Sequence, residues 1–249
     1  MPHRPPLPFT AAFIGITLLE IWGESLLDPW LHYTAKPLIM LSLMGWVLSR
    51  QSWAVMPSSL RWLLVGMAFA LAGDVFLMLR SGNWFVAGLG AFLVMQLCYI
   101  RAFYLSIREG QGMVSRNRLS EALFYFGFYG GLFLYYAKPY LARNPAYAGL
   151  WLPVFIYVVC ICTMGVMATV RKRAVRPMSH WAVMTGAILF VASDSLIALN
   201  KFVQPIPFAT FLIMITYAAA QYLIATGMMA SSIPANSPES QPTFTQKTL

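Results

Sequence analysis

Two aspartates stand inside long apolar segments of this chain. Asp74 lies in the stretch 71–79 and Asp194 in the stretch 192–199. A carboxylate at the centre of a membrane-inserted helix costs roughly 3 kcal/mol or more, so such residues usually have a function. Two carboxyl groups can divide acid–base chemistry, because one can deliver a proton while the other stays ionised and orients water. We therefore predict that Asp74 and Asp194 are catalytic.

The two aspartate segments repeat each other at an offset of 120 positions (194 − 74). The aligned pairs are Gly66 with Gly186, Gly73 with Ser193, Asp74 with Asp194, and Arg80 with Asn200. Positions seven apart are two helical turns apart, so each copy has a small or polar stripe beside its aspartate. The residues next to the two aspartates differ: Gly73 and Val75 flank Asp74, whereas Ser193 and Ser195 flank Asp194. The two serine hydroxyls can stabilise the ionised form of Asp194. Our hypothesis is therefore that Asp74 donates the proton, while Asp194 is the base and Ser193 supports it.

Further polar residues stand in or beside the apolar segments. Glu20 and Glu24 are one helical turn apart, and Lys36 follows them across a short connection. A site role for these three residues and a partly buried ion pair that joins two helices remain equal alternatives. Two more faces have helical spacing. They contain Phe85, Gly88, Phe92, Gln96 and Tyr99 on one, and Tyr217 and Gln221 on the other. Gln96 and Gln221 either support the site or form interhelical hydrogen bonds.

The composition is that of a polytopic membrane protein. Of the 249 residues, 59% are hydrophobic and 10% charged, whereas soluble domains have about 25% charged residues. We predict an all-α bundle of about eight transmembrane helices in a single domain, residues 1–230, and a disordered cytoplasmic tail, 231–249. The expected spans are 9–27, 31–49, 60–79, 84–106, 119–136, 150–170, 180–202 and 206–229.

The charge distribution predicts the orientation of the bundle. More Lys and Arg residues fall on the side of the two termini than on the other side, which places both termini in the cytoplasm. Asp74 and Asp194 then lie roughly 20 Å along their helices, in the outer half of a hydrocarbon core about 30 Å thick. We expect a polar chamber there, formed by the first, second, third and seventh spans, in a bacterial inner membrane.

Other chemistries are excluded by what the sequence lacks. His3, His32 and His180 lie outside the apolar segments or at their ends, on different sides, so we expect no metal site and no cofactor. The net charge of +9 comes from basic residues at span ends. We therefore expect membrane lipid, and no nucleic acid, as a partner. The sequence has no Gly-x-Ser-x-Gly elbow and no phosphate-binding loop. The oligomeric state stays open.

The chain resembles the YhhN-type lysoplasmalogenase family. The resemblance rests on Gly73-Asp74-Val75-Phe76-Leu77, the Phe85 to Tyr99 face, Ser193-Asp194, the pair Tyr217 and Gln221, and Lys36-Pro37. It covers most of residues 10–228. The family often has a histidine where this chain has Gln96, so we expect no proton transfer at this position. The resemblance implies an eight-span hydrolase that converts a lysoplasmalogen into a fatty aldehyde and a glycerophospho-base.

Acid–base chemistry by two buried carboxyl groups suits that reaction. A vinyl ether resists base but hydrolyses once its β-carbon receives a proton, because water then attacks the resulting oxocarbenium ion. No metal is needed, and a single-chain lysophospholipid can enter from the bilayer. A proton-coupled lipid or small-molecule transporter is the alternative, since intramembrane acids and repeated halves are also transporter features. An assembly factor with an acidic site is a third reading.

Overall fold

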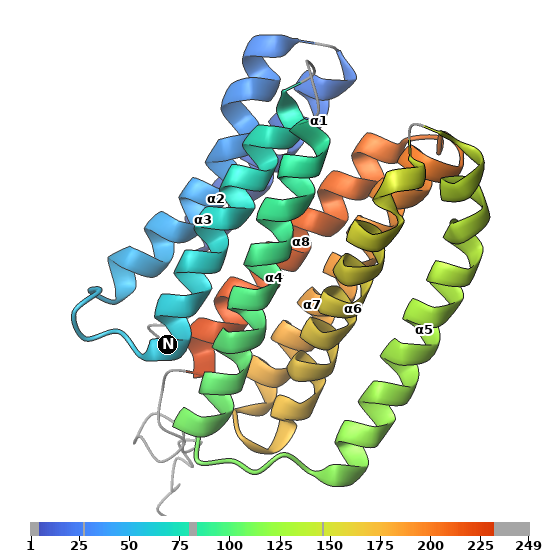
Figure 1. Ribbon diagram of the computed structural model, residues 1–249. Helices are drawn as coiled ribbons and strands as arrows, with labels where there is room; N and C mark the ends of the chain where they lie inside the picture. Colours follow the sequence, from blue (N-terminus) through green and yellow to red (C-terminus); the bar gives the residue numbers. More distant parts are fainter. Residues whose placement is uncertain (1–4, 27, 80–83, 146, 232–249) are drawn as a thin grey trace, which may run out of the picture.

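The computed structural model describes residues 5–26, 28–79, 84–145 and 147–231, and these residues form an all-helical bundle (Figure 1). The α-helices are α1 (Leu7–Ser25), α2 (Pro29–Arg50), α3 (Ser58–Met78), α4 (Trp84–Glu109), α5 (Arg116–Arg143), α6 (Trp151–Val170), α7 (Pro177–Ala198) and α8 (Ala209–Ser231). The predicted spans correspond one to one with these helices. The predicted tail lies outside the described residues except for Ser231, which ends α8.

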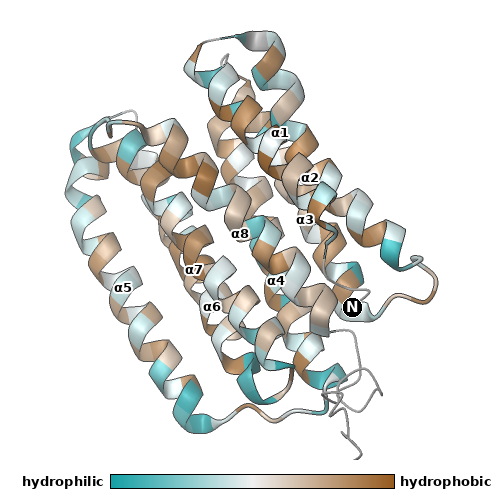
Figure 2. Ribbon diagram, turned by 180° about the vertical axis from the view of Figure 1, so that it is seen from behind, coloured by the Kyte–Doolittle hydropathy of each residue, from teal (hydrophilic) through white to brown (hydrophobic). Residues whose placement is uncertain are grey.

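Among the described residues, six helices are long and apolar enough to cross a membrane: α1, α3, α4, α6, α7 and α8. The chain is therefore a multi-pass membrane protein. α2 and α5 are long enough but more polar. Figure 2 shows polar residues at both ends of α5, where Arg116 and Arg143 lie. That these two helices also cross, and that both termini face the cytoplasm, stays a prediction.

Each aspartate helix pairs with the helix that follows it. α3 packs along α4 and α7 packs along α8, so the sequence repeat corresponds to two helical hairpins. A Cβ atom at Gly66 would lie 2.6 Å from the Tyr99 ring, and one at Gly73 would lie 2.7 Å from the Phe92 ring. Glycine at both positions lets α3 approach α4 closely, and this contact fixes where the two aromatic rings lie.

α8 passes between the two halves of the bundle (Figures 1 and 2). It packs against α7 and also contacts α1, α2 and α3. Near the start of α1, the Thr10 and Tyr222 hydroxyls are 2.7 Å apart and form a hydrogen bond. Because α8 touches α3 as well as α7, its polar residues can reach both aspartate helices.

α7 ends in a short π-helical segment, Leu199–Val203, that brings Phe202 back into the core. π-helical turns are rare and occur often at functional sites. Here the segment begins five residues after Asp194 (199 − 194) and directly continues the helix that carries this aspartate.

Candidate active site

Asp74 is buried on α3, where only 2% of its surface is exposed. The Tyr217 hydroxyl on α8 donates a hydrogen bond to its Oδ2 atom at 2.7 Å. Next to this pair, the Tyr99 hydroxyl on α4 donates to Oε1 of Gln221 on α8 at 2.6 Å. Three helices thus share one buried polar network around Asp74. Buried polar groups are costly unless they are hydrogen-bonded in this way.

Asp194 has a different tyrosine partner. The Tyr157 hydroxyl on α6 donates a hydrogen bond to Oδ2 of Asp194. The neighbouring Ser195 donates to the Val191 carbonyl at 2.6 Å, so the Tyr129 hydroxyl on α5 is the donor in its hydrogen bond with Ser195 Oγ. Asp194 is therefore bounded by α5 and α6, two helices that the sequence prediction had not assigned to the chamber.

An apolar cavity of about 60 Å³ opens beside Asp194. The helices α3, α4, α5, α6 and α7 and the π-helical segment form its walls. The lining residues include Asp194, Tyr157, Ser195, Phe85, Phe92, Leu77 and Ile161. Phe85 and Phe92, which the sequence places on one helical face, both line this cavity. The cavity differs from the expected polar chamber, because its lining is mainly apolar and includes no described residue of α1 or α2, and Asp74 is not among the lining residues.

A cluster of three aromatic rings lies next to Asp74. The rings of Phe92, Phe190 and Tyr217 contact one another, with centroid distances of 5.9 to 6.4 Å, and the Tyr217 hydroxyl is the one bonded to Asp74. Phe92 also lines the cavity, so the cluster connects the cavity wall with the partner of Asp74. The cavity itself reaches Asp194 and not Asp74.

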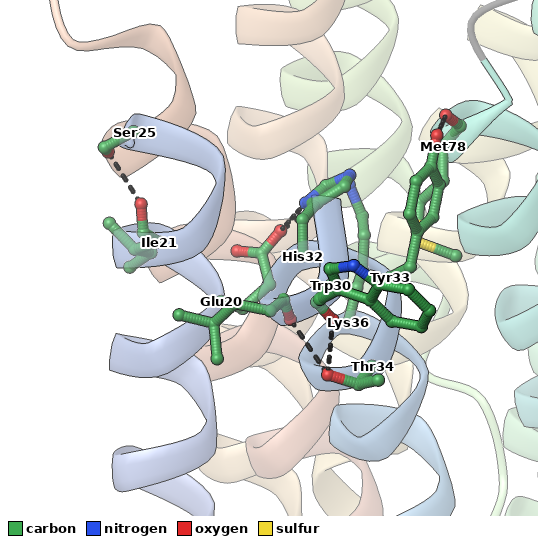
Figure 3. Close-up of polar contacts among 10 residues, drawn as sticks. Glu20, Ile21, Ser25, Trp30, His32, Tyr33, Thr34, Lys36 and Met78 are labelled. Carbon is green, nitrogen blue, oxygen red and sulfur yellow. Dashed lines mark hydrogen bonds and ion pairs between the residues drawn. The ribbon is translucent and has the colours of Figure 1, made fainter. Parts of the chain in front are cut away.

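The acidic residues of α1 lie near Asp74 as well. The Lys36 ammonium is 3.8 Å from Oε1 of Glu20, which confirms an ion pair between the first two helices. Glu20 and Lys36 are both within electrostatic range of Asp74. Figure 3 also shows His32 directed toward Glu20. His32 had been set aside because it lies near a helix end, yet its Nδ1 atom is 3.3 Å from Oε1 of Glu20.

Two predicted site residues take other positions. Ser193 donates to the Ile213 carbonyl on α8 at 3.1 Å and so ties two helices together, rather than supporting its neighbour Asp194. Successive helical residues point about 100° apart, so adjacency in sequence does not bring the two side chains together. Gln96 is fully buried near the Tyr157 hydroxyl, and its amide completes no hydrogen bond within the described residues.

The sequence analysis missed Tyr157 and Tyr129. Tyr157 stands in the most apolar α-helix among the described residues, but that helix also contains Thr163 and Thr169, so a hydroxyl there is not a distinctive signal. Tyr129 gives no distinctive signal either, because α5 has many aromatic residues exposed along its length.

Comparison with known proteins identifies the family of this chain. The YhhN family matches residues 31–228. The bovine protein named lysoplasmalogenase TMEM86A is 36% identical over 184 residues, which cover 72% of this chain and 69% of that protein. Human lysoplasmalogenase TMEM86B is 30% identical over 207 residues, or 82% of this chain and 78% of that protein.

A bacterial relative is similar over a longer stretch. The Mycobacterium bovis protein named lysoplasmalogenase is 28% identical over 209 residues, which cover 84% of this chain and 72% of that protein. No solved structure matches this chain. The family match extends from the third residue of α2 to the last turns of α8 and includes both aspartates, their tyrosine partners Tyr157 and Tyr217, and Gln221. The chain belongs to the YhhN family.

Proposed function

We propose that this protein hydrolyses the vinyl ether bond of a lysoplasmalogen, giving a fatty aldehyde and a glycerophospho-base. The observation that carries the proposal is the Asp194–Tyr157 pair at the wall of an apolar cavity. The names of the relatives support the same substrate class, since they are lysoplasmalogenases from mammals and mycobacteria.

The proposed reaction balances without a cofactor. A carboxylic acid transfers its proton to the β-carbon of the vinyl ether, which leaves an oxocarbenium ion at the α-carbon and oxygen. Water adds to the α-carbon and gives its proton to a carboxylate, which forms a hemiacetal. The hemiacetal hydroxyl then gives up its proton to a carboxylate while the bond from its carbon to the glycerol oxygen breaks. The glycerol oxygen takes a proton from the carboxylic acid, and the aldehyde is released. General acid–base catalysis of this kind typically contributes about 10²- to 10⁴-fold in rate.

The cavity suits the reactive end of an alkenyl chain. A water molecule needs roughly 10–15 Å³ of such space. The cavity of about 60 Å³ therefore has room for water beside several carbon atoms. Its walls are mainly aliphatic and aromatic, so a lipid chain can replace water there at no cost in lost hydrogen bonds.

We assign the role of base to Asp194, because it lines the cavity and Tyr157 holds its carboxyl group in place. Asp74 remains our proton donor. Leu77, which lies one helical turn from Asp74, lines the cavity, and so does Phe92, whose ring packs against Gly73, the residue before Asp74. A substrate that displaces this ring by a few ångströms would bring its β-carbon toward Asp74.

The test is aldehyde release by purified protein in detergent, with lysoplasmenylethanolamine as the substrate. Asp74→Asn and Asp194→Asn keep the size of each side chain, so both variants should fold and still lose at least ~100-fold in kcat. Near-normal hydrolysis by both would overturn the mechanism. If Asp74→Asn alone retains hydrolysis, the proposed site stands, but Asp74 is not the proton donor.

A proton-coupled transporter predicts a different result in the same experiment. Such a protein would release no aldehyde in detergent, although labelled lipid would still cross reconstituted vesicles. Measuring both quantities on one preparation therefore separates the two functions.

A further inference from the structure

A second cluster of ionisable side chains lies where the end of α1 faces the beginning of α2 (Figure 3). Glu20 and Glu24 are one turn apart on α1, and His32 stands on α2. One potential ligand atom from each of these three residues lies within 4.8 Å of the other two. Lys36, one turn after His32, is the fourth member of the cluster. None of the four lines the cavity beside Asp194.

Two ionisable side chains of this cluster are buried without hydrogen-bond partners among the described residues, which is unusual for such groups. Glu20 is 0% exposed and His32 is 6% exposed. Neither carboxylate oxygen of Glu20, nor Nδ1 of His32, has a hydrogen-bond partner in the described part of the chain. A buried carboxylate without hydrogen bonds is strongly disfavoured unless a cation compensates for it. The one ammonium group nearby, that of Lys36, is 3.8 Å away, which is long for a charge-assisted hydrogen bond.

The contact between His32 and Glu20 has the spacing of two ligands on one ion. Nδ1 and Oε1 are 3.3 Å apart, yet they do not form a hydrogen bond. Zinc binds imidazole nitrogen and carboxylate oxygen at about 2.0–2.2 Å in tetrahedral geometry, which places two ligand atoms about 3.4 Å apart. Glu24 is only partly buried, so its side chain has the freedom to complete the set.

We propose that Glu20, Glu24 and His32 form a binding site for a divalent transition-metal ion. One imidazole and two carboxylates best match zinc among the common ions, because magnesium and calcium prefer oxygen ligands alone. Three protein ligands leave a fourth position for water or another oxygen ligand. Lys36 balances the charge of Glu20 when the ion is absent, and the ion and the ammonium compete for the same oxygen.

The proposed ion has a structural role that is independent of vinyl ether hydrolysis. Its ligands come from two helices joined by a short connection, so binding would fasten the end of α1 to the beginning of α2. A metal site of this kind predicts that the thermal stability of the protein depends on the ion concentration.

The first experiment measures metal content and thermal unfolding of the full chain in detergent. Protein dialysed against a chelator and then against zinc should retain one zinc ion per chain, and its Tm should rise with zinc concentration. His32→Gln and Glu24→Gln should lose both effects. The matched controls, His180→Gln and Glu121→Gln, change a histidine and a glutamate elsewhere and should keep both effects.

Glu24→Gln is included because Glu24 is only partly buried, so this variant should fold even if a change at His32 disrupts the helix pair. Wild-type protein that retains no zinc and shows no shift of Tm would overturn the proposal. Zinc binding that persists in both His32→Gln and Glu24→Gln would overturn it as well, because the ion would then lie elsewhere.

The second experiment uses the competition between Lys36 and the ion. Lys36→Met removes the cation that balances Glu20, so this variant should melt below wild type in chelator. Added zinc should restore its Tm and should bind at least tenfold more tightly than to wild type. If Lys36 forms only a structural ion pair, zinc will not rescue the variant, and the proposed site is excluded.

Discussion

Tyr217 on α8 donates a hydrogen bond to Asp74 on α3, and the two residues are 143 positions apart in the sequence. This bond holds the buried carboxyl group in a fixed orientation beside the ring cluster of Phe92, Phe190 and Tyr217. Its partner helix belongs to the other hairpin of the repeat. Asp74 is therefore positioned by tertiary packing rather than by its own helical hairpin.

Tyr217→Phe should lower the rate of aldehyde release about three- to tenfold with little change in KM. As the proposed proton donor, Asp74 carries no charge before the transfer. A hydrogen bond to a neutral group is worth roughly 0.5–1.5 kcal/mol, and about 1.4 kcal/mol corresponds to a factor of ten in rate. Steady-state kinetics of the purified variant measure the effect. The control is Tyr222→Phe, which removes a hydroxyl of the same helix that contacts Thr10 instead. Equal losses in both variants would point to a general weakening of α8.

Tyr157→Phe should reduce kcat about tenfold or more, because Asp194 then loses the group that orients it. The ring remains, so the cavity keeps its shape and lipid binding should be unaffected. Binding of a non-hydrolysable ether lysolipid, measured by calorimetry in detergent, provides the second readout. A variant with normal kcat would show that Asp194 does not depend on this hydroxyl.

Filling the cavity should abolish hydrolysis without changing either aspartate. Ile161 lines the cavity and is 4% exposed, whereas Ile156 on the same helix is 42% exposed and faces away from the core. Ile161→Trp should raise KM or eliminate turnover, since an indole ring occupies space meant for the alkenyl chain. Ile156→Trp adds the same bulk outside the cavity and should remain active. Full activity of Ile161→Trp would mean that the substrate binds elsewhere.

The orientation of the bundle can be tested with reporter fusions. Fusions after Arg116 and after Arg173 should be cytoplasmic, and a fusion at Asn144 should be external, because basic residues prefer the cytoplasmic side. Alkaline phosphatase and green fluorescent protein report the two compartments. If the reporter after Arg173 is external, the seventh span runs in the opposite direction and Asp194 lies in the inner half of the membrane instead of the outer half.

The helices and the two aspartates could be predicted from sequence because both produce strong local signals. Apolar runs with polar or proline-containing breaks define the elements, and a carboxylate in such a run is conspicuous. The number of helices and their approximate bounds followed directly. An ion pair of Lys36 with a glutamate of the first helix was one of two equal alternatives, and the structure shows that its partner is Glu20.

The partners of the aspartates could not be predicted in the same way. Tyr217 was expected to share a helical face with Gln221, but which helix faces Asp74 is decided by how α8 packs between the halves. Tyr157 was missed because a tyrosine in an aromatic-rich chain is usually a packing residue. His32 was judged by its distance from a helix end, although the hairpin between α1 and α2 turns that position toward Glu20.

The tyrosine partners also have a consequence for how the molecule can be divided. Asp74 belongs to the first four helices but takes its hydroxyl donor from α8, whereas Asp194 finds Tyr157 within the last four. If the chain were cut in the connection between α4 and α5, the first fragment would contain an aspartate without its partner. Co-expressed fragments should then regain activity only by reassembling around α8. That helix makes the two halves an obligate pair, even though each carries its own copy of the aspartate motif.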